Sequence, residues 1–339
     1  MPSISDPTHL TLPSQDLSIP LSNTGSNIHP EVRPFLKWAG GKTQLLPYIR
    51  MFYPKKFGTY FEPFVGGGAV FFDLLRNKHL ETCDTKLLDT NSDVIGCYLQ
   101  IRDHVEQVID HLKQLELGHR KRRDQHFYEI RDKKFNPLRK HLGIHQKQTP
   151  HYTPELAAMS IYLNRTGFNG LFRLNSSGLF NVPMGRYSNP KICDSQNLRH
   201  VATALARPKL EIKLSSFELI RSQIIPGDFI YFDPPYLPIS ETAKFTSYTA
   251  NNFGLDDHMK LQKLVIELAQ RDCLVLLSNS TAPEITGLYH QNDDAKKAGL
   301  KAYTVPARRL INSRASKRHS VLEYLITNLK PQIRDRSTQ

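Results

Sequence analysis

Short apolar runs, each ending in glycine or polar residues, alternate with helix-like segments and predict an α/β fold. The run 60–65 leads into three glycines and then into the apolar segment 69–75, an order typical of strand, turn and helix. A second run, 86–88, predicts a strand that ends at Asp89. The helix after it is expected to be capped by Asn91, Ser92 or Asp93.

The alternation of strands and helices resumes after about residue 195. Apolar runs at 210–214, 229–232 and 274–277 predict three more strands, and the segment 258–269 predicts a helix. This order of elements favours a doubly wound sheet.

Residues 95–192 interrupt the alternation and are strongly basic, with 16 Lys or Arg against 8 Asp or Glu. Within them, 118–148 predicts a basic helical stretch, and 167–187 is rich in Asn, Gly, Ser and aromatic residues, as in a β-hairpin. We therefore expect one α/β domain, formed by residues 34–94 and 193–330, that is split by a second domain.

The N-terminal segment has a different composition. Residues 1–30 contain 14 Pro, Ser or Thr and no hydrophobic period, so residues 1–33 are expected to form a flexible tail. The segment has no Lys or Arg before Arg33 and no compact apolar block, which disfavours a secretory signal. No apolar stretch approaches the ~18 residues that span a bilayer. The four cysteines are scattered without a CxxC pair, so a cytoplasmic protein with reduced thiols is expected.

The net charge favours a polyanionic partner. The chain has 45 Lys and Arg against 32 Asp and Glu, a formal net charge of +13 and a pI near 9.5. Nucleic acid is the first candidate, and an anionic membrane surface is the second. A solvated surface is the simpler interpretation of the basic run.

Three glycines, Gly66, Gly67 and Gly68, lie where backbone amides can approach a ligand closely. They do not fit the GxGxxG fingerprint, since Phe71 stands at the third position after the last glycine, and a nicotinamide or flavin cofactor is therefore disfavoured. Asp89 follows at the end of the next strand. Its carboxylate is suited either to the two hydroxyls of a ribose or to capping the next helix.

Other chemistries match only in fragments. The sequence GKT at 41–43 imitates the end of a phosphate-binding loop, but Leu36 stands where GxxxxGK[ST] requires its first glycine. His104 and Glu106 begin a zinc deaminase signature that no PCxxC completes, and neither GxSxG nor HExxH occurs. No metal site is expected.

The most specific cluster is Asp233, Pro234, Pro235 and Tyr236, directly after the apolar run 229–232. Ligands bind at the carboxyl ends of strands in open α/β sheets. A carboxylate oxygen of Asp233 and the carbonyl oxygen of Pro234 can both accept hydrogens from an exocyclic amine, while the prolines supply no competing amide donor. Tyr236 can stack on the base that carries this amine.

Six ordered motifs resemble the Dam-type DNA adenine-N6 methyltransferases of the D12 class. They are FLKWAGGK at 35–42, EPFVGGG at 62–68, DTNSD at 89–93, YLNRTGFNGLFRLNSSGLFNVPMGRY at 162–187, DPPY at 233–236 and KFTSYTANNF at 244–253. The resemblance runs from Pro34 to about Leu329. It implies a Rossmann-like S-adenosylmethionine-dependent methyltransferase sheet with an inserted helical plus β-hairpin DNA-recognition domain.

The same resemblance implies a reaction and its residues. S-adenosylmethionine is the expected methyl donor, and the amino nitrogen of an adenine is the expected acceptor. The implied catalytic residues are Asp233, Pro234, Pro235 and Tyr236. The implied cofactor-binding residues are Trp38, Lys42, Phe64, Gly66, Gly68, Asp89 and Asp233.

Double-stranded DNA is the implied partner of a monomer that needs no other protein. The target adenine is expected to flip out of the duplex, so that Phe168 or Asn169 fills the vacated stack and Arg173 reads a guanine edge. Lys37 resembles the family residue that contacts the first guanine of GATC. Further DNA contacts are implied for Leu171, Pro183, Arg186, Arg308 and Arg309, the last two on phosphates.

GATC is the preferred target, and three alternatives stay open. The same chemistry could serve another target sequence in a restriction-modification system. The chain could be an inactive DNA-binding module, although the intact DPPY sequence argues against this. RNA could replace duplex DNA, although the hairpin motif favours the duplex.

Overall fold

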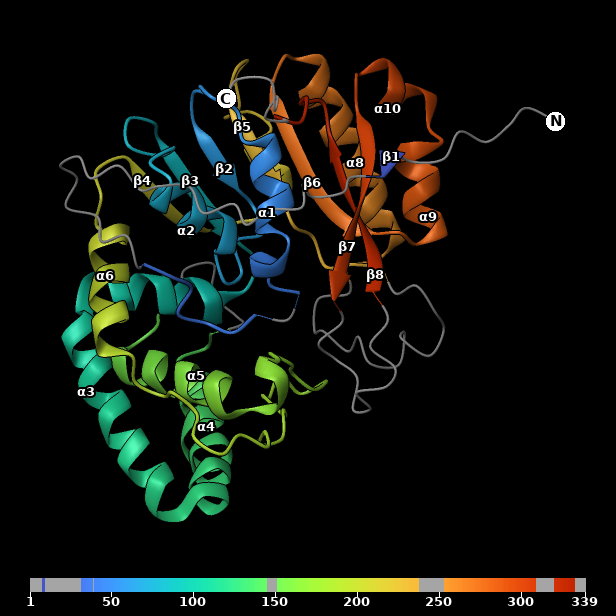
Figure 1. Cartoon of the computed structure of the whole chain (residues 1–339). Helices are drawn as coiled ribbons and strands as arrows, with labels where there is room; N and C mark the ends of the chain where they lie inside the picture. Colours follow the sequence, from blue (N-terminus) through green and yellow to red (C-terminus); the bar gives the residue numbers. More distant parts are fainter. Residues whose placement is uncertain are drawn as a thin grey trace, which may run out of the picture.

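An eight-stranded sheet lies at the centre of the computed structural model, in the order β1-β7-β8-β6-β5-β2-β3-β4 (Figure 1). The structure describes residues 8–9, 32–38, 40–144, 151–237, 253–308 and 320–332. The strands are β1 (Thr8–His9), β2 (Tyr60–Glu62), β3 (Thr85–Asp89), β4 (Leu210–Leu214), β5 (Phe229–Phe232), β6 (Leu274–Ser280), β7 (Lys301–Arg308) and β8 (Ser320–Thr327).

The strands from β4 to β6 pair in parallel, and β8 runs antiparallel between β6 and β7. The chain winds outward from β2 through β3 to β4, then returns to β5 beside β2 and continues to β6. This reversal confirms the doubly wound α/β class and makes the boundary of β2 and β5 the switch point of the sheet. β1, within the segment expected to be a tail, pairs in parallel with β7.

The predicted strands and helices are present, β4 and β5 with the predicted ends and the others with shifted ends. The strand expected over 60–65 ends at Glu62, since Pro63 has no amide hydrogen for the ladder. Asn91 caps the helix after β3, as its side chain accepts from the amides of Asp93 and Val94. The α-helices are α1 (Leu46–Ile49), α2 (Ala69–Arg76), α3 (Ser92–Tyr128), α4 (Asn136–His141), α5 (Pro154–Thr166), α6 (Ser195–Leu205), α8 (Leu255–Gln270), α9 (Pro283–Ile285) and α10 (Asp293–Lys297).

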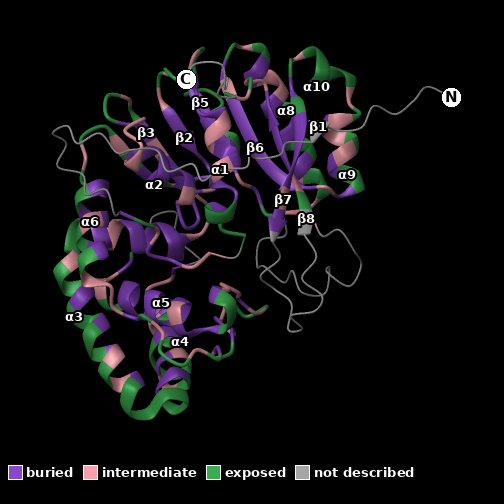
Figure 2. Ribbon diagram, in the orientation of Figure 1, coloured by how far each residue is buried: buried purple, intermediate pink, exposed green. Residues whose placement is uncertain are grey.

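Alternate residues of β5 pack into two cores on opposite faces of the sheet. Phe229 and Tyr231 belong to the core that contains residues of α2, α3, α5 and α6. Ile230 and Phe232 belong to the core that contains residues of α8. The burial colours of Figure 2 show both layers covering the strands. The central strands are therefore buried on both faces, and their carboxyl ends are the places where they offer polar groups.

Helices α3, α4 and α5 lie below the sheet in the view of Figure 1. The backbone of α3 leaves helical geometry at His104 and Arg123, and a π-helix, η3 (Glu129–Phe135), leads into α4. The basic stretch predicted to be helical is therefore helical over most of 118–144; residues 145–150 lie outside the described part. None of the helices that the structure describes is long and apolar enough to cross a membrane.

The segment 167–187 has the antiparallel course of the hairpin expected there, without a continuous ladder. It forms two isolated antiparallel bridges, Gly167 with Met184 and Leu174 with Phe180, and a short 3-10 turn, η4 (Phe168–Gly170). Backbone hydrogen bonds join its two limbs, from the amide of Asn175 to the carbonyl of Leu179 and from the amide of Asn181 to the carbonyl of Arg173. Side chains of the neighbouring helices bond to three further carbonyls of its return limb. We call this segment the recognition loop; the expected domain boundaries at 94 and 192 remain a prediction.

Candidate active site

Two loops leave the sheet side by side at its switch point. Tyr60 and Phe61 of β2 pair with Phe229 and Ile230 of β5. The glycine turn that follows β2 and the loop 233–236 that follows β5 therefore emerge at the same edge. An open α/β sheet binds ligands in the crevice at such a point.

The glycine turn is held by Asp89 at the end of β3. The Asp89 carboxylate accepts hydrogen bonds from the amides of Gly66, at 2.9 Å, and Asn91, at 2.9 Å. Gly66 has φ +45°, and a Cβ added to it would lie 2.7 Å from Nε1 of Trp38. The Trp38 ring therefore packs against the turn. Burial raises the pKa of Asp89 to about 6, against the opposing effect of these amide donors.

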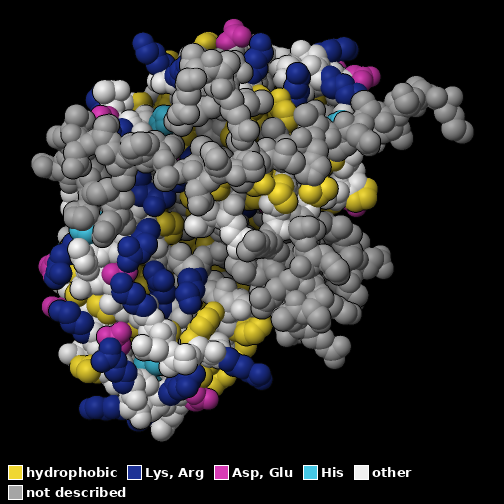
Figure 3. All heavy atoms as spheres, viewed as in Figure 1, with side chains coloured by type: hydrophobic (Ala, Val, Ile, Leu, Met, Phe, Trp, Pro, Cys, Tyr) yellow, Lys and Arg dark blue, Asp and Glu magenta, His cyan; other side chains and the backbone are white. Residues whose placement is uncertain are grey.

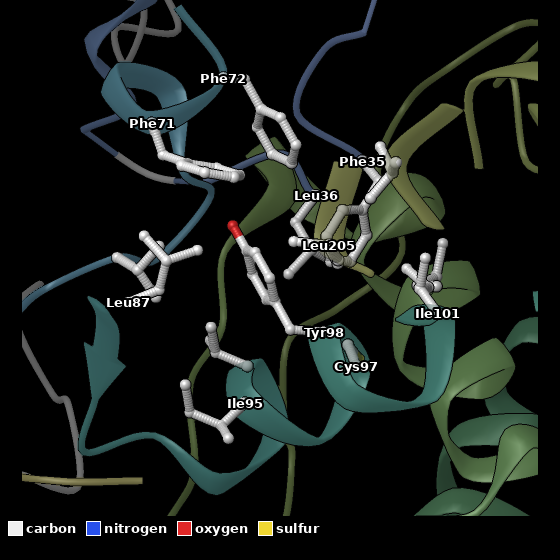
Figure 4. Close-up of a cluster of buried hydrophobic side chains, with 14 of the residues drawn as sticks. Phe35, Leu36, Phe71, Phe72, Leu87, Ile95, Cys97, Tyr98, Ile101 and Leu205 are labelled. Carbon is white, nitrogen blue, oxygen red and sulfur yellow. The ribbon is translucent and has the colours of Figure 1, made fainter. Parts of the chain in front are cut away.

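Gly68, the N-cap of α2, lies against a buried hydroxyl. It has φ +68°, and a Cβ added to it would lie 2.4 Å from the oxygen of Tyr98. Figure 4 shows the Tyr98 hydroxyl pointing toward Phe71 and Phe72 from the opposite side of the core. Among the residues that the structure describes, this hydroxyl has no hydrogen-bond partner. Both the backbone conformation and the space therefore require glycine here.

An ion pair joins the opening motif to the loop after β5. Lys42 Nζ lies 2.7 Å from Asp233 Oδ1 and donates to the carbonyl of Gly40 at 2.7 Å. The same ammonium lies 4.5 Å from the ring centre of Tyr236. Burial raises the pKa of Asp233 to about 6, while Lys42 opposes that rise. The structure thus brings together Lys42, Asp233 and Tyr236, as predicted.

A third carboxyl group, that of Glu62, lies at this edge and was not assigned from the sequence. It is 2% exposed and accepts a hydrogen bond from the Tyr60 hydroxyl at 2.7 Å. Burial raises the pKa of Glu62 to about 8, and the charges of Asp233 and Asp89 add to the rise. The carboxylates of Asp89 and Asp233 make this edge favourable for a cationic ligand, whereas Glu62 is mostly protonated at pH 7.

Residues from α8, β6 and β8 form hydrogen bonds with the loop that follows β5. His258 Nε2 donates to the carbonyl of Pro235 at 3.1 Å; burial lowers the pKa of His258 to about 4, so this imidazole is neutral at pH 7. Ser280 donates to the carbonyl of Leu237 at 3.0 Å. The Tyr236 hydroxyl donates to Glu323 Oε2 at 2.9 Å.

Sequence reasoning missed these supports. The only local signal was a histidine on the apolar stripe of a helix, three residues before Leu261 and seven before Val265. Phe64, predicted to bind the cofactor, lies near this region, with its ring stacked on Phe217 at 5.5 Å between centres.

The predicted DNA-contacting residues of the recognition loop lie on one exposed segment. Phe168 is 45% exposed, and Asn169, Pro183 and Arg186 are exposed as well. Leu171 and Arg173 are half-buried.

Hydrogen bonds and ring contacts link this loop to the opening motif. The side-chain amide of Asn164 donates to the carbonyls of Lys37, at 2.7 Å, and Gly170, at 3.1 Å. The ring of Trp38 stacks on Phe172, with 6.3 Å between centres. Lys37 therefore lies beside the recognition loop. The predicted cofactor-binding residue Trp38 also contacts this loop, so the predicted cofactor-binding and DNA-binding residues are neighbours.

The last two predicted DNA contacts are not tested by this geometry. The side chain of Arg308 and the whole of Arg309 lie outside the described residues. On the face shown in Figure 3, Lys and Arg side chains gather over the region of α3 to α6. This distribution agrees with the excess of basic residues in 95–192.

Comparison with known proteins identifies the family. A model described as D12 class N6 adenine-specific DNA methyltransferase matches residues 38–304. The chain is 37% identical over 298 residues to the Type II methyltransferase M1.LlaDCHI of Lactococcus lactis subsp. cremoris, which covers 88% of this chain and 95% of that protein. It is 38% identical over 309 residues to the Type II methyltransferase M.MjaIII of Methanocaldococcus jannaschii, covering 88% and 99%.

A third relative is the DNA adenine methylase of Escherichia coli (strain K12), 32% identical over 293 residues, which covers 86% of this chain and 94% of that protein. Both the family match and these relatives span most of the chain, including the switch point of the sheet and the recognition loop. The chain is therefore an enzyme of the D12 class of N6 adenine-specific DNA methyltransferases.

Proposed function

We propose that the chain transfers a methyl group from S-adenosylmethionine to N6 of the adenine in GATC, after that adenine has flipped out of duplex DNA. The observation that carries the proposal is the meeting of Lys42, Asp233 and Tyr236 at the switch point of the sheet. The loop 233–236 there presents two acceptors and an aromatic ring, which suit an amino-substituted base.

The residues of this edge fit the proposed cofactor. When bound, S-adenosylmethionine would supply a methyl group on a sulfonium, an activated and positively charged leaving group. The carboxylates of Asp89 and Asp233 favour such a cation. Asp89 would hold the ribose hydroxyls, since a carboxylate has about four acceptor sites and two amides use only part of them.

Orientation of the amine is the main catalytic task of the chain. Lys42 contacts one oxygen of Asp233, so the carboxylate retains acceptor capacity for a hydrogen of the N6 amine. The carbonyl of Pro234 would accept the other hydrogen. Positive charge that develops on N6 would then lie against two preoriented acceptors.

Tyr236 would stack on the extruded adenine. Its hydroxyl is fixed by Glu323, and Lys42 lies near its ring, so the orientation of the ring is set before the base arrives. Phe168, exposed near the start of the recognition loop, would fill the gap left in the duplex.

GATC is proposed because the opening motif and the recognition loop, whose sequences resemble those of GATC methyltransferases, lie together through Asn164. A different target is the main competitor, because two relatives carry the name Type II methyltransferase. Methylation of a random-sequence duplex library, followed by mapping of the modified adenines, separates the two. We expect GATC around every modified adenine. Another shared sequence would retain the chemistry and overturn the target.

Base flipping is tested separately with 2-aminopurine at the target position of a GATC duplex. Its fluorescence is quenched by stacking, so we expect a rise when the protein and S-adenosylmethionine are added to this duplex. A duplex with 2-aminopurine one base pair outside the site is the control. Equal fluorescence changes at both positions would contradict flipping of the target base.

A further inference from the structure

Three side chains of the basic helical stretch bond to alternate residues of the recognition loop. Arg131 Nη1 donates to the carbonyl of Val182 at 3.0 Å. Asn136 donates to the carbonyl of Phe180 at 3.0 Å and accepts from the amide of Phe180 at 2.8 Å. Arg139 Nη1 donates to the carbonyl of Gly178 at 2.9 Å.

The spacing of the two segments explains this match. Phe180 and Val182 direct their carbonyls to one side, as alternate positions of an extended chain do, and Gly178 lies in the turn just before them with φ +72°. Residues 131 and 136 are five apart, and the wide turn of the π-helix η3 brings such positions closer to one face than an α-helix does. The amide of Asn136 bonds to both polar groups of Phe180, as a neighbouring strand would.

The brace formed by Arg131, Asn136 and Arg139 is anchored in the protein interior. The Arg139 guanidinium binds both oxygens of Asp93, at 2.7 and 2.8 Å, and the two side chains are 2% and 1% exposed. The Tyr152 hydroxyl donates to the same carboxylate at 2.8 Å. Asp93 lies in the first turn of α3, next to the cap that follows β3. The brace therefore ties the recognition loop to the end of the sheet.

Asn181 connects the braced limb to Arg173, the residue expected to contact a base. Asn181, between the two braced residues Phe180 and Val182, accepts from Arg173 Nε at 2.8 Å. The backbone amide of Asn181 also donates to the backbone carbonyl of Arg173 at 3.1 Å. Two isolated bridges are the only ladder pairs in the described recognition loop. The position of the Arg173 guanidinium thus depends on the brace.

We propose that Arg131, Asn136 and Arg139 are positioning residues for target discrimination: they hold the return limb of the recognition loop so that Arg173 meets its base pair. The inference rests on the proposed function, since it takes the recognition loop to be the reader of the DNA sequence. It assigns to the basic stretch a role other than general attraction of phosphates.

The test compares single-turnover methylation of a GATC duplex with that of a duplex changed at one base pair. Arg131→Ala and Asn136→Asp are the test variants, because Arg131 is partly exposed and Asn136→Asp keeps the shape while replacing the donor to Phe180 with an acceptor. Lys134→Ala is the matched control; it removes a positive charge from the same π-helix at an exposed position. Arg131→Lys tests rescue, since it restores one donor.

We expect the ratio of the two rates to fall about tenfold or more in both test variants, the loss that accompanies a displaced base contact. The ratio should stay unchanged in Lys134→Ala and recover in part in Arg131→Lys. The affinity for S-adenosylmethionine should be equal in all folded variants.

Two results would overturn the proposal. An unchanged ratio of the two methylation rates in a folded Arg131→Ala protein would show that the brace stabilises the fold without affecting target discrimination. An equal fall in Lys134→Ala would assign the effect to charge. If the wild type prefers another site, only the proposed target fails, and the variants are compared on that site. A wild type that methylates no DNA overturns both proposals.

Discussion

Lys42 Nζ lies 2.7 Å from Asp233 Oδ1, so the opening motif and the loop after β5 meet as an ion pair at the switch point of the sheet. The Lys42 side chain is 5% exposed, and Gly40 and Tyr236 occupy its other sides. A buried ammonium in this position favours the ionised form of Asp233 and fixes the direction of its carboxylate. The charge of the Asp233 carboxylate and its direction both determine how it can accept a hydrogen from the amine.

Asp233→Ala should lower kcat by on the order of 10²-fold or more, the loss typical of removing one preoriented polar group from a developing charge. Affinity for a random-sequence duplex should remain close to that of the wild type, because the basic surface is unchanged. Single-turnover methylation and a DNA-binding titration measure the two quantities. Full activity of the folded variant would disprove the role of Asp233.

The activity should fall in acid with a midpoint set by Asp233. Since its pKa is about 6, the carboxylate takes up a proton as the pH falls through this value and loses both the Lys42 contact and an acceptor for the amine. We expect kcat/KM to decrease below about pH 6. Lys42→Gln removes the group that opposes the rise in pKa, so the midpoint of the remaining activity should move to higher pH. An unchanged midpoint in Lys42→Gln would show that the loss of activity in acid is not caused by protonation of Asp233.

Glu62→Gln should change how stability depends on pH. The pKa of Glu62 is raised from 4.5 to about 8 in the folded state, so the folded protein binds this proton more tightly than the unfolded chain does. The contribution of Glu62 to the free energy of unfolding is therefore largest below pH 4.5 and decreases as the pH rises to about 8.

Gln retains an acceptor for the Tyr60 hydroxyl but does not titrate, so the variant should lose less stability between pH 6 and pH 8.5 than the wild type. Denaturant unfolding at the two pH values measures the difference. Parallel curves for the two proteins would show that Glu62 does not carry a raised pKa.

Tyr236 and Glu323 should act as a coupled pair. Glu323→Leu leaves the Tyr236 hydroxyl without its acceptor and frees the ring, whereas Glu323→Gln keeps an acceptor oxygen. We expect Glu323→Leu to lower kcat several-fold, about 1 kcal/mol for one hydrogen bond, and Glu323→Gln to lower it less. In Tyr236→Phe the Leu substitution should have a much smaller effect. Additive effects in this double-mutant cycle would exclude the coupling.

Arg173→Ala should relax sequence preference more than it weakens binding to random DNA. A bidentate contact with guanine contributes about 1–3 kcal/mol of discrimination. Methylation rates on GATC and on single-substitution duplexes measure this loss. Equal weakening on every sequence would instead place Arg173 on a phosphate.

The sequence predicted the elements whose signals are local. A buried strand followed by DPPY, glycines before an apolar helix, and Asn91 before Ser92 each carry their signal within a few residues, and the structure has all three. The supports of the loop 233–236 could not be found this way. Glu323 reaches Tyr236 only because β8 inserts between β6 and β7, and that pairing is set by the fold as a whole.

The recognition loop shows the same limit. Its turn-forming residues predicted a hairpin, and its two limbs do pair. The sequence did not predict that Asn136 and Arg139 bond to main-chain groups of its return limb. In the sequence these side chains belong to a stretch predicted only to be helical and basic. Only the π-helix and the bend of α3 bring them to the loop.

The most direct test of the account is transfer of labelled methyl groups from S-adenosylmethionine to three duplexes: one with GATC, one with the scrambled site GTAC, and one with GATC already methylated on both strands. We predict label on unmodified GATC alone, and a rate there on the order of 10²-fold lower with Asp233→Ala. Equal label on GTAC would contradict the proposed target. A wild-type rate of labelling of GATC by the folded Asp233→Ala protein would contradict the proposed chemistry.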